Sequence, residues 1–406
     1  MTLNKLLRRG VEALIAGGLF MPGMQAQQVI LYTAADLNAV TDAVRSGDKD
    51  ARVLVEELLK RGDRILRRAP RSVTEKEAVP PSGDKRDYMS MARYWWPDPS
   101  KADGLPYIRR DGETNPEIEK IEDHRFLNET VRAVQVLAFS CYFSGKQAYA
   151  RKAVDFLRTW FLDDSTRMNP NLNYAQSVPG RYPGRSFGII DTRRLASLVD
   201  VIPLLPESEA WRSQEQGRLR EWFSDYYEWL RTSELGREEE KALNNHGTWY
   251  DVQAASIALY LGKRDDAMEI LTRAKELRIG LQIAPDGSQP EELARTVSWD
   301  YSLFNLEALF LLASLGERVG VDLWNHESGD GRSLRKALDF LCAVAEGEQE
   351  WDYKQIRAIK FDRLCPLLED AESRYDDHRY QELRERLGCM SGWSERVRWN
   401  WKSLIH

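Results

Sequence analysis

Apolar residues recur at steps of three and four along most of the chain, which is the period of an amphipathic helix. In residues 50–68 the apolar positions are Val53, Leu58, Leu59, Ile65 and Leu66. The same spacing predicts further helices over residues 126–142, 148–161, 192–205, 209–230, 248–261, 265–281, 301–315, 333–345 and 378–387. Convincing period-two segments that would indicate strands are hard to find.

This succession of helices, separated by short Gly- or Pro-containing connections, predicts an all-α fold. So many helices cannot bury their apolar faces in one simple bundle with a single seam. Antiparallel pairs arranged around a ring solve this problem, because each pair covers its neighbour. We therefore expect an incomplete (α/α) toroid of about six or seven helical hairpins, with long loops lining a cleft at one end.

Two stretches break the helical pattern, residues 70–120 and residues 165–190. Long irregular segments in a compact domain are usually functional or disordered. The first is too rich in aromatic residues to be disordered, and the second carries aromatic residues and arginines. We expect them to gather at the cleft. No Ser- or Pro-rich linker divides the rest of the chain, so residues 27–406 are predicted to form a single domain.

The composition narrows the classes of function. The chain has 406 residues, 30% of them charged, and 41 aromatic residues that require burial or a ligand. The net charge of −6 argues against nucleic acid as a partner, because nucleic-acid binding needs a basic surface.

Several chemical motifs are absent from the sequence. There is no phosphate-binding GxxxxGK[ST], no GxSxG, no HExxH and no dinucleotide-binding glycine pattern. The five histidines are not paired at metal-ligand spacing, and no two of the four cysteines form a CxxC pair. We therefore predict neither a metal nor a cofactor, and we expect Cys141 and Cys342, which lie on apolar stretches, to be buried thiols.

Residues 1–26 have the layout of a secretory signal peptide. Lys5, Arg8 and Arg9 precede a mostly apolar stretch over residues 11–20, and Gln25-Ala26 before Gln27 is a plausible small-residue cleavage point. This pattern predicts a periplasmic or secreted protein. Neither this stretch nor any other apolar run reaches the roughly 20 residues that span a bilayer, so we expect no membrane span.

The first candidate for chemistry is the group Asn244, Asn245 and His246, followed by Trp249 and Tyr250. It lies where a charged stretch gives way to an apolar helix, and an Asn there can cap the helix. The free N–H groups of a helix N-terminus also favour anions, so amide and imidazole side chains at this position can bind a carboxylate. The alternative is a simple cap followed by a structural histidine.

The second candidate is the pair Arg295 and Tyr301, at the start of the helix predicted over residues 301–315. The two are six residues apart, so they share a site only if a turn lies between them. The alternative is an exposed arginine and a half-buried tyrosine.

A third candidate is the aromatic run Tyr94, Trp95 and Trp96. Flat aromatic faces stack on sugar rings, and a helical core does not need consecutive tryptophans in a loop. The alternative, a clasp that packs the loop onto the ring, does not exclude stacking.

The fourth candidate is a basic cluster of Arg181, Arg185, Arg193 and Arg194, with Arg109 and Arg110 in the first irregular segment. Guanidinium groups near aromatic residues in an acidic protein point to an anionic ligand. The alternative is scattered surface charge.

Taken together, these residues resemble those of the alginate lyases that fold as α/α toroids. The resemblance rests on the NNH motif at 244–246, on ELAR at 292–295 shortly before a tyrosine, and on the loop sequences YMSMARYWWP at 88–97 and GETNP at 112–116. The broader group includes enzymes that act on alginate and on glucuronan. The resemblance implies that Asn245, His246, Arg295 and Tyr301 form the catalytic centre and that the partner is an anionic polysaccharide.

The chemistry implied by the resemblance is β-elimination on a 4-linked uronate. A base removes the proton at C5, and the C4–O bond then breaks. Asn245, His246 and Arg295 are expected to neutralise the uronate carboxylate. Tyr301 is the expected base and acid, with its pKa lowered by Arg295, and His246 is the alternative base.

Two other classes of protein stay open from the sequence. One is a toroidal glycoside hydrolase that uses paired carboxylates, Asp251 with Glu291 or Asp300. The other is a glycan-binding protein without catalysis that keeps the aromatic run and the arginines.

Overall fold

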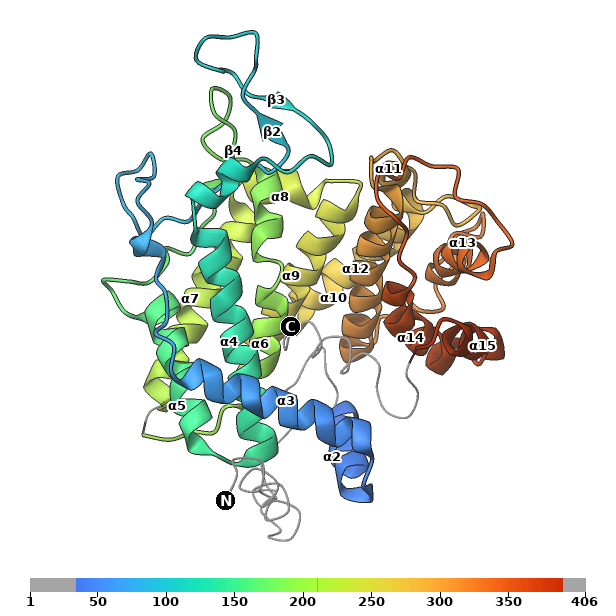
Figure 1. Ribbon diagram of the computed structural model, residues 1–406, viewed down its shortest axis with the longest axis horizontal. Coiled ribbons are helices and arrows are strands. Elements are labelled where there is room, and N and C mark those ends of the chain that lie inside the picture. Colours follow the sequence, from blue (N-terminus) through green and yellow to red (C-terminus); the bar gives the residue numbers. More distant parts are fainter. Residues whose placement is uncertain (1–33, 210, 390–406) are drawn as a thin grey trace.

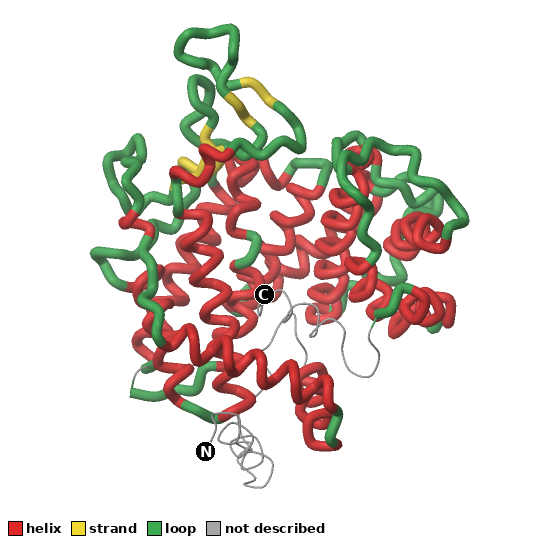
Figure 2. Tube along the Cα trace, viewed as in Figure 1, coloured by secondary structure: helices red, strands yellow, loops and turns green. Residues whose placement is uncertain are grey.

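The computed structural model describes residues 34–209 and 211–389, and this part of the chain is mainly helical (Figures 1 and 2). Its α-helices are α2 (Ala34–Ser46), α3 (Lys49–Leu66), α4 (Asp123–Ser144), α5 (Gln147–Leu157), α6 (Leu195–Val201), α7 (Ser213–Thr232), α8 (Glu234–Glu240), α9 (Asn245–Leu261), α10 (Arg264–Ala274), α11 (Pro290–Leu293), α12 (Ser298–Val319), α13 (Leu334–Glu346), α14 (Cys365–Tyr375) and α15 (His378–Arg386). The prediction of an all-α fold is confirmed.

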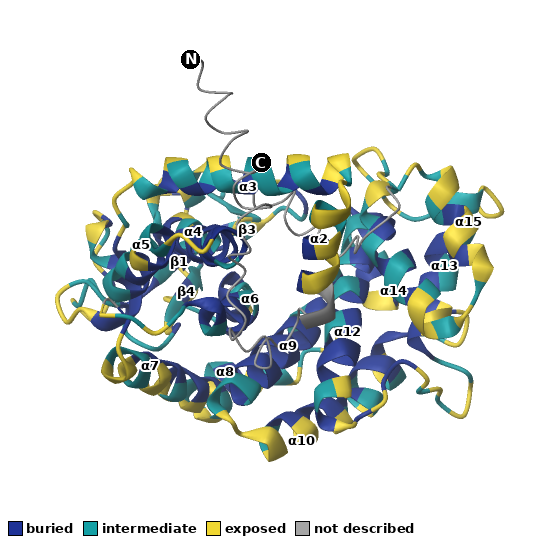
Figure 3. Ribbon diagram, turned by 90° about the horizontal axis from the view of Figure 1, so that it is seen from below, coloured by how far each residue is buried: buried dark blue, intermediate teal, exposed yellow. Residues whose placement is uncertain are grey.

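The helices are arranged around a ring (Figure 3). Helices α4, α9 and α12 are buried on nearly all sides, as expected for inner helices that carry apolar residues all round. Helices α3, α5, α10 and α13 bury one stripe and expose the other, so they form the outer side. Consecutive helices pack as pairs in α2–α3, α4–α5, α9–α10, α12–α13 and α14–α15.

Apolar side chains meet in one connected core that extends from Leu37 in α2 to Leu383 in α15. Within residues 34–209 and 211–389, no helix combines the length and the apolar character needed to cross a membrane.

Several predicted helix boundaries are wrong. The helix predicted over residues 209–230 begins only at Ser213, because residues 208 and 211 form a bridged turn before it. The helix predicted over residues 192–205 is reduced to α6, which a 3₁₀ turn containing Pro203 ends. The helix predicted from residue 248 begins at Asn245, so the Asn-His pair lies in its first turn.

The two irregular segments contain short strands that the sequence did not predict. Strand β1 (Met89–Met91) pairs in parallel with β4 (Tyr174–Ser177), which joins the two segments to each other. Strands β2 (Trp95–Trp96) and β3 (Ile108–Arg109) form an antiparallel pair. All four strands are too short to show alternation, and they lie at one end of the helical ring (Figure 2).

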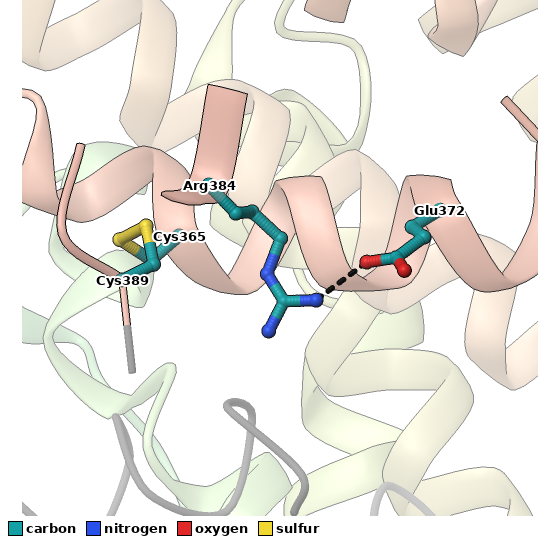
Figure 4. The surroundings of a disulfide bond; sticks show 4 residues. All are labelled: Cys365, Glu372, Arg384 and Cys389. Atoms are coloured by element: carbon teal, nitrogen blue, oxygen red, sulfur yellow. Dashed lines mark hydrogen bonds and ion pairs between the residues drawn. A yellow bond between two sulfur atoms is a disulfide. The ribbon is translucent and has the colours of Figure 1, made fainter. Parts of the chain in front are cut away.

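The cysteines fall into two groups. Cys141 and Cys342 are buried free thiols, as predicted. Cys365, at the start of α14, forms a disulfide with Cys389, which follows α15, and this bond lies beside the ion pair between Arg384 and Glu372 (Figure 4). The disulfide therefore closes the α14–α15 hairpin.

Candidate active site

A cavity of about 670 Å³ lies at the end of the ring where the two irregular segments meet. Four parts of the chain supply its lining: residues 93–124, 176–193, 244–246 and 291–304. Most of the residues singled out from the sequence lie in this lining, namely Tyr94, Trp95, Arg185, Arg193, Asn244, Asn245, His246, Arg295 and Tyr301.

Trp249 and Tyr250 were expected to contact a ligand, and the structure places both in the core instead. Tyr250 is 1% exposed, and its hydroxyl donates to the Leu230 carbonyl at 3.0 Å. The Trp249 ring packs against Phe304 with 5.0 Å between centroids, and the Arg193 guanidinium lies 5.9 Å from the Trp249 ring. Because α9 is inner and buried on nearly all sides, side chains one turn below its first residues cannot reach the cavity.

Trp96 and Arg181 also stand outside the cavity lining. Trp96 Nε1 donates to the Glu113 carbonyl at 3.0 Å. Arg181 Nε donates to the Tyr107 carbonyl at 2.8 Å, and its guanidinium lies over the Trp95 ring. Both side chains therefore hold the loop in place. For Trp96 this agrees with the alternative interpretation of the aromatic run as a clasp.

The first turn of α9 holds the Asn-His pair. Asn244 is the N-cap, and its side chain accepts a hydrogen bond from the His246 backbone N–H at 3.1 Å. Asn245 donates to the buried carboxylate of Glu292 through its backbone N–H at 2.6 Å and through Nδ2 at 2.9 and 3.0 Å. The Asn245 amide donor is therefore engaged by Glu292, a residue that the sequence analysis did not single out.

His246 is held by a second buried carboxylate. Its Nδ1 lies 2.6 Å from Glu239 Oε1, and Glu239 is 1% exposed. The Phe187 ring packs on the imidazole with 4.5 Å between centroids. Glu239 and Phe187 were also missed from the sequence.

Tyr301 and Arg295 form a second group of side chains in the cavity lining. The Arg295 guanidinium lies 3.7 Å from the centre of the Tyr301 ring, and the Tyr301 hydroxyl is 3.1 Å from the Tyr94 hydroxyl. Burial raises the pKa of Tyr301 above its usual value, and this effect outweighs the charge of Arg295, which lowers it. The expectation that Arg295 brings this pKa below its usual value is therefore wrong for this structure.

Asp111 engages the Arg295 charge. Arg295 donates to both Asp111 oxygens, with the shortest contact at 2.7 Å from Nη2, and Thr296 donates to Oδ2 through its backbone and hydroxyl. The loop reaches this close because Gly112 has a φ of +79° and a Cβ there would lie 2.4 Å from Thr296 Oγ1. The Gly after Asp111 is the only sequence signal for this contact.

Arg185 and Arg193 contribute positive charge to the cavity. Neither forms an ion pair with a carboxylate in the described part of the chain; Arg185 donates to Gln176, and Arg193 to the Ile190 carbonyl. Burial lowers the pKa of each to about 10, so both remain charged at neutral pH. Carboxylates such as Asp191 lie near both arginines but beyond ion-pair distance, so both guanidinium groups can still pair with an anionic ligand.

The structure removes Asp251 from the pair of carboxylates expected for a glycoside hydrolase. Asp251 is fully buried and forms an ion pair with Arg278 at 2.7 Å, so it cannot reach a substrate. Asp300 accepts a hydrogen bond from Gln355, and only Glu291 of the three lines the cavity. No cluster of three or more His, Cys, Asp or Glu side chains in the described ranges could hold a metal ion.

The Glu292 carboxyl gives a pH-dependent prediction. Burial raises its pKa from 4.5 to about 6, against the hydrogen bonds from Asn245. The folded protein therefore binds a proton that the unfolded chain releases, and stability falls as pH rises through this window, by about 2 kcal/mol. We expect the stability of Glu292→Gln relative to wild type to rise by about this amount between roughly pH 4 and pH 7, as measured by denaturant unfolding. A difference that does not change with pH would contradict the assignment.

A ring of helices whose loop-covered cavity presents Asn, His, Arg and Tyr beside unpaired arginines defines a helical protein with a site for an anionic ligand. The family model described as alginate lyase matches residues 72–351. The chain belongs to the alginate lyase family.

Solved structures agree with this assignment. The crystal structure of an alginate lyase from Bacteroides ovatus is 40% identical, covers 88% of this chain and 95% of its own, and superposes with a TM-score of 0.84. Alginate lyase A1-III from Sphingomonas species A1 is 19% identical over 90% of this chain and 93% of its own, with a TM-score of 0.57. A variant of A1-III complexed with a tetrasaccharide is 20% identical over 91% and 93%, with a TM-score of 0.58. These structures confirm the prediction of an α/α toroid. A search of the curated protein sequences found no match.

Proposed function

We propose that this protein is a polysaccharide lyase that cleaves a 4-linked polyuronate by β-elimination, acting on alginate or glucuronan. The observation that carries the proposal is the position of Tyr301. Its hydroxyl lies in the cavity, and its ring lies under the Arg295 guanidinium, in a cavity that also holds His246 and two unpaired arginines. Membership of the alginate lyase family supports the reaction class.

The arginines are proposed to make the weakly acidic C5 proton easier to remove. Removing this proton places negative charge on C5 and on the adjacent carboxylate, and fixed cations stabilise that charge as it develops. Arg185 and Arg193 are free to do this, whereas Asp111 engages Arg295. We therefore assign Arg295 to Tyr301 rather than to the uronate carboxylate.

Tyr301 is the acid in each of two routes. Its raised pKa keeps it protonated, so it can give its proton to the leaving O4 as the C4–O bond breaks and the C4=C5 double bond forms. Where the C5 proton and O4 lie on the same face, as in mannuronate and glucuronate, Tyr301 also has to take the C5 proton. This route starts from its ionised form, which is the minority form because the pKa of Tyr301 is raised. Where they lie on opposite faces, as in guluronate, His246 takes it through Nε2.

The test is ultraviolet absorbance with polymannuronate, polyguluronate and glucuronan as separate substrates. Elimination creates a double bond conjugated to the carboxylate, which absorbs, whereas hydrolysis does not. We expect absorbance to rise on polymannuronate or glucuronan. New reducing ends without absorbance would support the hydrolase, and binding without either product would support the glycan-binding protein.

We also propose that the protein is exported and that residues 27–406 fold as one domain. Residues 1–26, which carry the signal-like pattern, lie outside the described residues. The Cys365–Cys389 disulfide supports an oxidising compartment, and the connected core from Leu37 to Leu383 supports one domain. Recovery of the protein from the periplasm or the medium with Gln27 as its first residue would test the export; recovery from the cytoplasm with residue 1 retained would contradict it.

A further inference from the structure

A buried carboxylate lies directly behind the imidazole of the candidate site. Glu239 is in the last turn of α8 and is 1% exposed, while its neighbours Glu238 and Glu240 are exposed and half-buried. Its Oε1 lies 2.6 Å from His246 Nδ1, and it forms no ion pair with a lysine or arginine in the described part of the chain. A carboxylate in such a place needs a hydrogen-bond donor, and His246 is the donor provided.

The turn between α8 and α9 fixes the two residues relative to each other. The fully buried Arg278 donates to the Glu240 carbonyl at 2.7 Å and to the Ala242 carbonyl at 2.8 Å. Gln282 donates to the Asn244 carbonyl at 3.2 Å. The backbone that carries Glu239 and His246 is therefore anchored from outside the turn at three carbonyls.

The carboxylate decides which ring nitrogen of His246 carries the proton. An ionised carboxylate only accepts hydrogen bonds, so Nδ1 must be the N–H nitrogen when the imidazole is neutral. With Nδ1 turned to Glu239 and Phe187 packed on the ring, Nε2 is left for the cavity that His246 lines.

We propose that Glu239 is a positioning residue that holds His246 as the Nδ1–H tautomer and presents Nε2 to the reacting uronate. The expected effect on turnover rests on the proposed function, whereas the tautomer of His246 does not depend on it. Neutral His246 then offers a lone pair at Nε2 toward C5, and protonated His246 offers an N–H toward the carboxylate. An Nε2–H tautomer of the neutral ring could not take the proton.

The experiment measures the imidazole ¹⁵N shifts of histidine-labelled protein at about pH 9, well above the usual histidine range. His246→Gln identifies the signals of His246 among the five histidines. We expect a pyrrole-like Nδ1 and a pyridine-like Nε2 in the wild type. In Glu239→Gln, which keeps the shape but can donate as well as accept, we expect the other tautomer or a mixture.

The matched control is Glu292→Gln, which removes the other buried carboxylate behind the Asn-His pair. It contacts Asn245 and not His246, so the His246 tautomer should stay as in the wild type. An Nε2–H tautomer in the wild type, or identical His246 shifts in wild type and Glu239→Gln, would overturn the proposal. If Glu239→Gln does not fold, the wild-type tautomer still decides.

Turnover supplies the second measurement. On the polymer that the wild type cleaves, we expect Glu239→Gln to lower kcat by about 100-fold and to change KM by less than about threefold, because binding groups stay in place. An unchanged kcat with an altered tautomer would show that the tautomer does not matter for catalysis. If the wild type cleaves none of the three polymers, the proposed function fails while the shifts still test Glu239.

Discussion

We expect Tyr301→Phe to lower lyase turnover by about 10³-fold or more. The substitution removes only the hydroxyl and leaves a ring of the same shape under Arg295, so the cavity keeps its form. The hydroxyl is the group assigned to protonate O4, and water cannot replace it efficiently in a half-buried position. Initial rates from ultraviolet absorbance measure the loss, and calorimetric titration with the polymer should show binding within about threefold of wild type.

Tyr94→Phe is the matched control, because it removes the other hydroxyl of the same hydrogen bond. Tyr94 is not assigned a proton transfer, so we expect a loss of no more than about tenfold. Equal losses in the two variants would assign the chemistry to the hydroxyl pair rather than to Tyr301. A Tyr301→Phe enzyme that keeps more than about a tenth of the wild-type rate would overturn the assignment.

The helical part of the fold could be predicted because burial leaves a period in the sequence. Helix α12 carries apolar residues along its whole length, and its predicted position is nearly correct. Helix α8 was missed because its sequence, ELGREEE, has no apolar stripe, and its deeply buried residues are Gly236 and Glu239. Helix α14 begins with a proline in its first turn and is short, so its period is weak.

The candidate site also contains residues that could be predicted from the sequence and residues that could not. The Asn-His pair, Arg295 and Tyr301 could be found because their residue types and spacing are unusual. Their partners could not, because a glutamate in a charged run looks the same whether it faces solvent or an imidazole. Glu239 differs from Glu238 only by its place on the helix. Asp111 lies 184 positions away from Arg295 in the sequence, so their contact cannot be read from local spacing.

A buried ion pair helps to fix the irregular segment that brings Tyr94 and Asp111 to the site, together with the pairing of β1 with β4. Lys76 and Asp123 are both fully buried, with 2.8 Å between Nζ and Oδ2. Lys76 also donates to the Val73 and Lys85 carbonyls at 2.7 Å each. Asp123, the first residue of α4, accepts a further bond at 2.9 Å from the backbone N–H of Met89, the first residue of strand β1.

We expect Lys76→Met to destabilise the protein by about 3–5 kcal/mol, because it keeps the length of the side chain but leaves a carboxylate and two carbonyls buried without their donor. The loss should depend on pH. Burial already raises the pKa of Asp123 to about 6, and removal of Lys76 raises it further, so the variant gains from protonation as pH falls. Denaturant unfolding should therefore show a smaller loss at about pH 5 than at about pH 8.

The control is the double variant Lys76→Met with Asp123→Asn, in which neither charge remains and the amide oxygen can still accept from Met89. It should recover a substantial part of the loss, because an unpaired buried charge costs more than a neutral amide. If Lys76→Met alone costs less than about 1 kcal/mol, the pair does not fix the segment. Both variants can also be assayed for lyase activity. If both lose activity while α4 stays folded, the ion pair is needed to position Tyr94 beside Tyr301. The stability of this loop would then be linked to catalysis.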